Sequence, residues 1–258
     1  MTVRLHVDSP LAADAEMSLP PGAARHAQVR RVQPGDTLLL FDGAGADWPA
    51  TVLAVGRSEV RVQVGRPQPV ATELPRAVTL AVGMPANERM DTLVEKATEL
   101  GVAAIQPLMT QRSVLRLAGE RATRKQAHWQ AIAVAACEQC GRARVPVVSP
   151  VRELADWLAH APGELHGTTE GPGRHAPLRL VLSLQPDAVA LPALPGTGTG
   201  CVFALSGPEG GLTPEEEAAA RAAGFRPVAL GPRVLRADTA PLALLAWLGI
   251  AQSHTSVG

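Results

Sequence analysis

The alternation of short apolar runs with amphipathic segments over residues 77–252 constrains the fold most strongly. Runs of strand type occupy residues 77–82, 102–108, 145–148, 178–184, 201–205 and 227–230. Segments with helical spacing occupy residues 87–101, 119–139, 151–160, 213–224 and 239–252. Such alternation is typical of an α/β domain with a mostly parallel sheet. Local patterns alone favour an unknotted doubly wound sheet, because knotted chains are nearly absent from proteins.

The first 65 or so residues have a different pattern, that of a small β-barrel. Short runs with period-two alternation and Gly-rich turns predict strands at residues 37–41, 50–55 and 60–64. Residues 66–75 contain three prolines, which indicates a linker. We therefore expect two domains, at residues 1–70 and 75–255.

Charge and cysteine content limit the class of protein. The 24 basic and 24 acidic residues create no net field for nucleic acid, so any RNA contact must come from local patches. Three cysteines in 258 residues fit a reducing cytoplasm better than a disulfide framework. The first residues lack a signal-peptide pattern, and no apolar run reaches the roughly 18 residues of a membrane helix. We expect a soluble, cytoplasmic protein with no membrane partner.

Two loops have the pattern of a ligand site. Ser206–Gly211 lies between a buried strand and a helix whose capping box begins at Thr213, where open α/β sheets place ligand crevices. Its three glycines allow close backbone approach, although an ordinary turn is the alternative. The second loop, Leu230–Ala240, ends where Thr239 is expected to cap the last helix. Arg236 just before that helix opposes its dipole and so indicates an anionic partner.

The segment from Ala204 to Trp247, beginning ALSGPEGGLTPEEE, closely resembles the C-terminal signature of the RsmE family. This family methylates a uracil ring nitrogen in small-subunit ribosomal RNA. Three more blocks agree in order: His26–Asp36 with FDG at residues 41–43, Glu95–Val114, and Trp129–Pro146. The resemblance covers most of the chain.

The resemblance implies a fold and an activity. A small PUA-like β-barrel, an RNA-binding domain, would precede an α/β domain of the SPOUT type, whose chain threads a trefoil knot. The cofactor would be S-adenosylmethionine, with no metal, and the acceptor N3 of a uridine in 16S ribosomal RNA. The enzyme would act as a homodimer. Free RNA and the assembled small subunit both remain possible substrates.

The resemblance also implies site residues by matching position. Three loops should bind the cofactor largely through backbone groups: Leu182, Ser183, Leu184, Leu205, Ser206, Gly207, Pro208, Glu209, Gly210, Gly211, Leu230, Gly231, Val234, Leu235, Thr239 and Ala240. Arg236 and Asp238 are the catalytic candidates on the substrate side. The uracil nitrogen must lose a proton, and Asp238 is the candidate base.

Four positions depart from the family pattern. Asp238 stands where glutamate is usual, Ala237 where a hydroxyl residue is common, and Leu212 where phenylalanine is usual. Ala86 stands where a lysine is expected, so one basic RNA contact is missing. None of these changes removes the pocket, but the acid at position 238 has a shorter reach.

Local basic residues are the candidates for RNA contact, since so few aromatic residues leave little scope for base stacking. The candidates are Arg25, His26, Arg31, Arg112 and Arg142, and the resemblance gives more weight to Arg31, Arg112 and Arg142, which match family positions. For any one of them a solvated surface role is the alternative. Cys137 and Cys140 have CxxC spacing, but no second ligand pair completes a metal site, so packing is the favoured interpretation.

Two other functions stay open on the sequence. A related SPOUT protein could use the same cofactor to methylate a ribose 2′-hydroxyl. A ribosome-binding or assembly factor could keep the fold without turnover. Product analysis separates the two enzymes.

Overall fold

The computed structural model describes residues 2–86, 88–160, 176–191 and 200–253. The chain divides into two compact units. The first comprises Met1–Glu73 together with Val134–Val145, and the second comprises Leu74–Ala133 and Pro146–Gly258. The long helix α3 (Gly119–Cys140) therefore contributes its last turns to the first unit.

A six-stranded sheet of order β1-β3-β4-β5-β2 forms the first unit, with β6 paired to β4. Its strands are β1 (Arg4–His6), β2 (Glu16–Ser18), β3 (Thr37–Phe41), β4 (Ala46–Val55), β5 (Val60–Val64) and β6 (Gln68–Pro69). The predicted strands at 37–41, 50–55 and 60–64 are thus confirmed. Helix α1 (Pro21–Val29) buries Ala23, Ala24 and Ala27. No prediction included this helix, because three alanines give a weak apolar stripe.

The predicted parallel sheet is present in the second unit, where every strand pair is parallel. The strand order is β10-β8-β7-β13-β11-β14-β12, with β9 paired to β8. The strands are β7 (Val78–Gly83), β8 (Ala104–Met109), β9 (Val147–Val148), β10 (Arg152–Glu153), β11 (Leu178–Leu182), β12 (Val189–Ala190), β13 (Val202–Ser206) and β14 (Arg226–Ala229).

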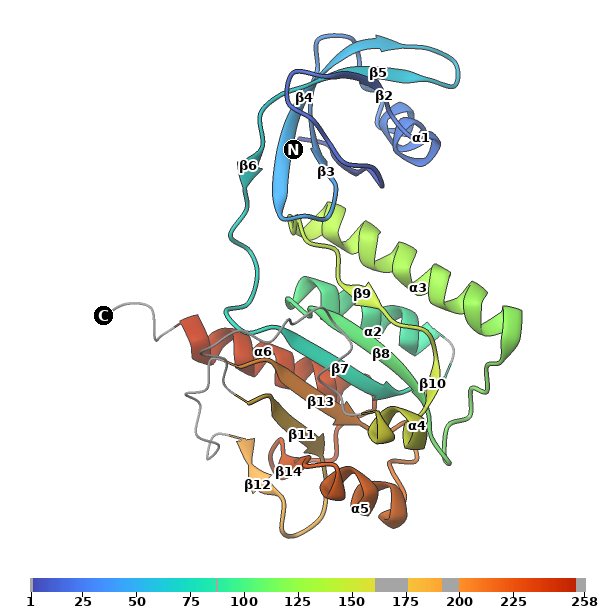
Figure 1. Ribbon diagram of the computed structural model, residues 1–258, viewed down its shortest axis with the longest axis vertical. Helices are drawn as coiled ribbons and strands as arrows, with labels where there is room; N and C mark the ends of the chain where they lie inside the picture. The colour runs from blue at the N-terminus through green and yellow to red at the C-terminus, as the bar shows by residue number, and fades with distance from the viewer. Residues whose placement is uncertain (1, 87, 161–175, 192–199, 254–258) are drawn as a thin grey trace. The chain divides into compact units, whose positions relative to one another are not determined.

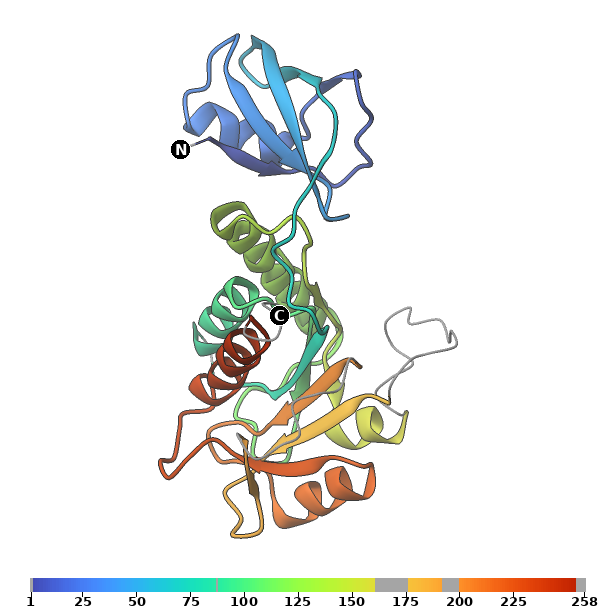
Figure 2. The same cartoon turned by 90° about the vertical axis from the view of Figure 1, so that its left-hand side faces the viewer.

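Helices cover both faces of this sheet (Figures 1 and 2). They are α2 (Glu88–Glu99), α4 (Leu154–Ala159), α5 (Pro214–Ala222) and α6 (Thr239–Ser253), in addition to α3. Helices α2 and α6 lie on one face and α4 and α5 on the other (Figure 2). Trp157 of α4 and Phe225 after α5 are buried against sheet residues Val181 and Leu205. Asn87, the expected cap of α2, lies outside the described residues.

The capping box expected at the start of α5 is confirmed. Thr213 Oγ1 accepts the N–H of Glu216 at 3.2 Å, and Glu216 Oε2 accepts the N–H of Thr213 at 2.9 Å. Two of the otherwise unpaired N–H groups at the helix end are thereby satisfied. Nowhere in the described ranges is a helix both long and apolar enough to cross a membrane. The trefoil knot stays a prediction.

Candidate active site

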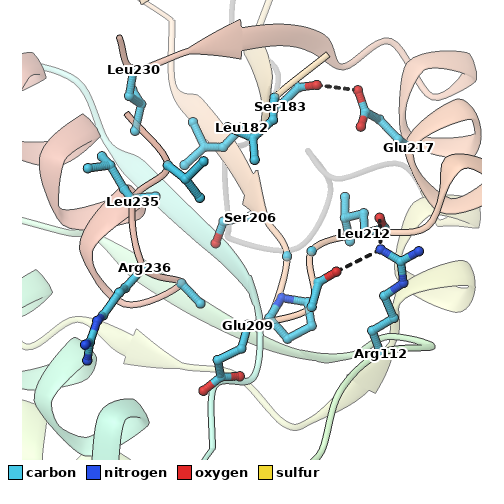
Figure 3. A pocket seen from close by; sticks show the side chains of 18 of the residues that line it. Arg112, Leu182, Ser183, Ser206, Glu209, Leu212, Glu217, Leu230, Leu235 and Arg236 are labelled. Atoms are coloured by element: carbon cyan, nitrogen blue, oxygen red, sulfur yellow. Dashed lines mark hydrogen bonds between the residues drawn. The ribbon is translucent and has the colours of Figure 1, made fainter. Parts of the chain in front are cut away.

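A cavity of about 620 Å³ lies at the carboxyl ends of three adjacent parallel strands. Ser206 ends β13, Leu182 ends β11, and Leu230 directly follows β14. Because the strands are parallel and neighbouring, the loops that follow them converge at one edge of the sheet and surround the cavity (Figure 3). The loops come from segments far apart in the sequence.

The three loops expected at the cofactor site are those that line this cavity. The predicted residues found in its lining are Leu182, Ser183, Leu184, Ser206, Gly207, Pro208, Glu209, Gly210, Gly211, Leu230, Gly231, Val234, Leu235 and Ala240. Two predicted residues are absent from the lining. Leu205 is fully buried in the core beneath the site, and Thr239 is the first residue of α6.

Close backbone packing explains one glycine of the SGPEGG loop. A Cβ on Gly207 would lie 2.7 Å from the carbonyl carbon of Gly211 and 2.7 Å from the nitrogen of Leu212. The loop therefore folds back on its own backbone, which leaves no room for a side chain. For Gly207 the alternative interpretation, that the turn itself requires the glycine, is therefore the correct one.

The chemistry of the lining fits a nucleoside cofactor. Ser206 is 4% exposed, and its buried Oγ has no hydrogen-bond partner among the described residues. A buried hydroxyl without a partner is costly and marks a place where a ligand atom would bind. At the rim of the cavity, Leu184 and Val234 are 73% and 78% exposed. Apolar walls with a few polar groups are the usual surroundings of an adenine ring.

Glu209 connects the SGPEGG loop to the segment before α2. Its Oε1 accepts the backbone N–H of Ala86 at 3.0 Å and pairs with Arg89 at 3.2 Å. The alanine at position 86, where a lysine was expected, therefore contributes a backbone hydrogen bond to the loop. Glu209 lines the cavity, but its carboxylate is already held by this segment.

A second polar connection was missed by the sequence reasoning. The Ser183 hydroxyl donates a hydrogen bond to Glu217 Oε1 at 2.6 Å (Figure 3). Glu217 lies on α5, lines the cavity and has a side chain only 12% exposed. Arg221 joins Glu217 to Asp187. In the sequence, Glu217 is one of several acidic residues at the start of a helix. Acidic residues are common there because they interact favourably with the helix dipole, so this pattern does not indicate a site residue.

Besides Arg89, which pairs with Glu209, three arginines line the cavity, each with different surroundings. Arg112 Nη1 donates to the carbonyl oxygens of Gly210 at 2.8 Å and Leu212 at 3.3 Å. Arg233 and Arg236 line the exposed mouth, and within the described part of the chain neither guanidinium has a hydrogen-bond or ion-pair partner. Two unpaired cations at the mouth of a cavity suit an anionic substrate.

Asp238 was expected on the substrate side and not among the cofactor-binding residues. It does not belong to the cavity lining, although its neighbours Ala237 and Arg236 do. Its Oδ1 is buried, with no hydrogen-bond partner in the ranges that the structure describes. An unsatisfied carboxylate oxygen is an available acceptor, and a position outside the lining suits a role toward the substrate and not toward a ligand that fills the cavity.

The remaining candidates for RNA contact lie in the first unit and differ in exposure. Arg25 and Arg31 are exposed. His26 Nδ1 lies 3.2 Å from Glu138. Arg142 is 3% exposed and forms a two-pronged ion pair with Glu73. A buried, paired guanidinium suits a structural role and does not favour the RNA contact that was expected of Arg142.

The CxxC pair has the surroundings of packed side chains. Cys137 is buried in a cluster with Phe41 and Ala143, and this burial raises the pKa of its thiol to about 12. Among the described residues no group of three or more His, Cys, Asp or Glu side chains could hold a metal ion. A thiol kept protonated in this way is a poor nucleophile and metal ligand.

Comparison with known proteins agrees with this architecture. Residues 72–249 match the family model for an RNA methyltransferase domain, and residues 19–65 match that for an RNA methyltransferase PUA domain. The chain is 33% identical over 249 residues to the ribosomal RNA small subunit methyltransferase E of Synechocystis, covering 95% of this chain and 77% of the relative.

Two solved structures have the same fold. The methyltransferase E of Neisseria gonorrhoeae, bound to S-adenosyl methionine, is 35% identical with a TM-score of 0.84, over 95% of this chain and 96% of that one. A Legionella pneumophila methyltransferase in complex with its bound cofactor SAM is 31% identical with a TM-score of 0.86, over 97% and 98%. The expected resemblance is confirmed: this chain belongs to the ribosomal RNA small subunit methyltransferase E family of RNA methyltransferases, with an N-terminal PUA domain.

Proposed function

We propose that this protein transfers the methyl group of S-adenosylmethionine to N3 of a uridine in the 16S RNA of the small ribosomal subunit. The observation that carries the proposal is the cavity at the ends of β13, β11 and β14. It is lined by backbone of the SGPEGG loop, by apolar side chains and by the unpartnered Ser206 hydroxyl. The family to which the chain belongs is named for this class of reaction.

The cavity-lining loops would hold the cofactor. The leucines at positions 182, 184, 230 and 235 offer apolar walls for an adenine ring, and Ser206 Oγ offers a hydrogen bond. S-adenosylmethionine supplies a methyl group made electrophilic by its positively charged sulfur. The chain's main contribution is to orient the two reactants, because correct alignment removes much of the barrier to such a displacement.

Arg236, Arg233 and Asp238 would act on the RNA side. The two unpaired guanidinium groups at the mouth bind phosphate and so fix the position of the target uridine. When the new N–C bond replaces the S–C bond, the N3 proton must leave. Asp238 is the proposed acceptor, and within the described part of the chain no donor competes for its Oδ1. Because the uracil N3 carries its proton at neutral pH, a base held next to it allows the reaction to proceed at that pH.

The biological setting follows from the substrate. We infer that the protein works in the cytoplasm, where ribosomes are assembled, and that it does so as a homodimer. We also infer that the chain near the cavity is knotted. Light scattering on the purified protein tests the dimer, which would have about twice the 26.9 kDa mass of one chain.

One experiment tests the function. The purified protein is incubated with labelled S-adenosylmethionine and with small subunits from cells that lack the modification, and nucleosides are identified by mass spectrometry. Label in 3-methyluridine at one position supports the proposal, and label on a ribose contradicts the N3 assignment. If the protein binds the cofactor but no label is transferred, the assignment of small-subunit RNA as the substrate is contradicted. Free 16S RNA, run in parallel, shows which form is methylated.

A further inference from the structure

One wall of the cavity is the loop that begins at Ser183. This residue lines the cavity although it is only 6% exposed. Its hydroxyl donates to Glu217 Oε1 at 2.6 Å and accepts the N–H of Gln185 at 3.1 Å. A serine has a single O–H donor, and here the protein uses it. Ser183 therefore shapes the wall and has no hydroxyl proton left for a ligand.

The same loop is held at its far end by a second side chain of α5. Arg221 Nη1 and Nη2 donate to the two carboxylate oxygens of Asp187 at 2.6 Å and 3.0 Å. The hydrogen bonds from Arg221 lower the pKa of the Asp187 carboxyl below its usual value. Arg221 Nη2 also donates to Glu217 Oε1 at 2.9 Å. Glu217 Oε1 therefore contacts one end of the loop, Ser183, directly, and is linked to the other end, Asp187, through Arg221.

Helix α5 also begins at the opposite wall. Its capping residue Thr213 follows the SGPEGG loop after Leu212, and the capping box fixes the direction in which the helix starts. Glu217 comes four residues after this cap and lines the cavity itself. The spacing between the SGPEGG loop and the 183–187 loop is consequently set by one rigid helix.

We propose that Glu217 is a positioning residue for the cofactor: it holds Ser183 directly, and Asp187 through Arg221, so that the 183–187 wall is formed before S-adenosylmethionine enters. A preformed wall lowers the entropy that binding must remove, and so raises affinity without contacting the reacting atoms. The inference rests on the proposed function, since it assumes which cofactor fills the cavity. It predicts an effect on cofactor binding and little effect on the chemical step.

Substitution of Glu217 tests the inference by calorimetry and steady-state kinetics. Glu217→Ala is expected to raise the Kd for S-adenosylmethionine about tenfold, the loss expected for a hydrogen bond to a charged group, with kcat at saturating cofactor within about twofold. Glu217→Gln keeps an acceptor oxygen for Ser183 and should recover most of the affinity. Ser183→Ala should weaken binding as well, and the double variant should bind no more weakly than Glu217→Ala alone.

The matched control is Glu99→Ala. Glu99 pairs with Lys96 on α2 at 2.8 Å and is not part of the cavity lining, so its loss should leave the Kd unchanged. Thermal melts identify any variant that fails to fold, and Ser183→Ala then carries the test. A Kd for Glu217→Ala within twofold of the parent, or a Gln variant as weak as the Ala variant, overturns the inference.

Hydrogen exchange separates this inference from the proposed function. If the parent protein does not bind S-adenosylmethionine, the proposed function fails whatever Glu217 does. The claim about the loop is tested without cofactor, because Glu217→Ala should speed exchange at the Gln185 N–H, which donates to Ser183. Unchanged exchange at Gln185 in that variant overturns the positioning role even where the parent binds the cofactor.

Discussion

Arg112 Nη1 donates a hydrogen bond to the carbonyl oxygen of Gly210 at 2.8 Å, and the stem of the same side chain lies against that glycine. A Cβ built on Gly210 would be 3.1 Å from Arg112 Cβ. A residue expected to contact RNA therefore supports the loop that lines the cofactor cavity. This relationship joins the segment after β8 to the SGPEGG loop.

Replacement of Arg112 should weaken cofactor binding. In Arg112→Ala the carbonyls of Gly210 and Leu212 lose their charged donor, and we expect the Kd for S-adenosylmethionine to rise about tenfold. Calorimetry measures this value. Arg124→Ala removes an exposed arginine from an ion pair within α3 and serves as the control. An unchanged Kd with weaker RNA binding would instead assign Arg112 to RNA alone.

Gly207 should not tolerate even a methyl group. Since the new Cβ of Gly207→Ala would lie 2.7 Å from backbone atoms of Gly211 and Leu212, the loop must move, and cofactor binding should be lost in calorimetry. We also expect a lower melting temperature. The matched control is Gly22→Ala in α1, where nothing lies within 4 Å and the helix should gain roughly 0.5–1 kcal/mol. A Gly207→Ala protein that binds normally would contradict the packing argument.

The two unpaired arginines at the mouth should affect RNA and not the cofactor. Arg233→Ala and Arg236→Ala are each expected to raise the KM for RNA severalfold while the Kd for S-adenosylmethionine stays the same. Each lost phosphate contact should reduce the slope of log affinity against log salt by about one. Lys96→Ala is the control, because that lysine is held between Glu95 and Glu99. A salt slope identical to that of the parent would exclude phosphate contact.

Asp238→Asn tests the proposed base. An amide cannot take the N3 proton, so kcat should fall about a hundredfold or more with the cofactor Kd unchanged. Asp238→Glu keeps a carboxylate at this position and is expected to retain activity. An Asn variant with the kcat of the parent would remove Asp238 from the chemical step and leave deprotonation to another group.

The raised pKa of Cys137 predicts slow reaction of its thiol. With a pKa of about 12, only about one ten-thousandth of this thiol is ionised at pH 8 in the folded protein. Cys140 and Cys201 are partly exposed and should react with a thiol reagent first. Folding keeps the thiol protonated, so its contribution to stability is complete below pH 9 and is lost as pH rises toward 12. Equal labelling of all three thiols in the native state would contradict the burial argument.

The sequence by itself determined most of the secondary structure, the parallel sheet and the loops around the cavity. Hydrophobic periodicity, the Thr213 capping box and the glycines of the SGPEGG loop are local patterns, and each can be recognised without knowing what packs against it. The family signature then identified the reaction class. The extent of each unit could not be predicted from local patterns, because residues 134–145, which include the end of α3, belong with the N-terminal unit although they lie far from it in the sequence.

Only the tertiary structure decided how individual side chains are used. Ser183 meets Glu217 across 34 positions of sequence, and Arg142 meets Glu73 across 69. The cavity loops meet because β11, β13 and β14 are neighbours in the sheet. No local sequence pattern predicts this strand order. Arg112 and Arg142 look alike in sequence as basic loop residues. Arg112 donates hydrogen bonds to carbonyl oxygens beside the cavity, whereas Arg142 is buried in an ion pair with Glu73. Their partners differ because the packing around each side chain, and not the residue type, determines what it contacts.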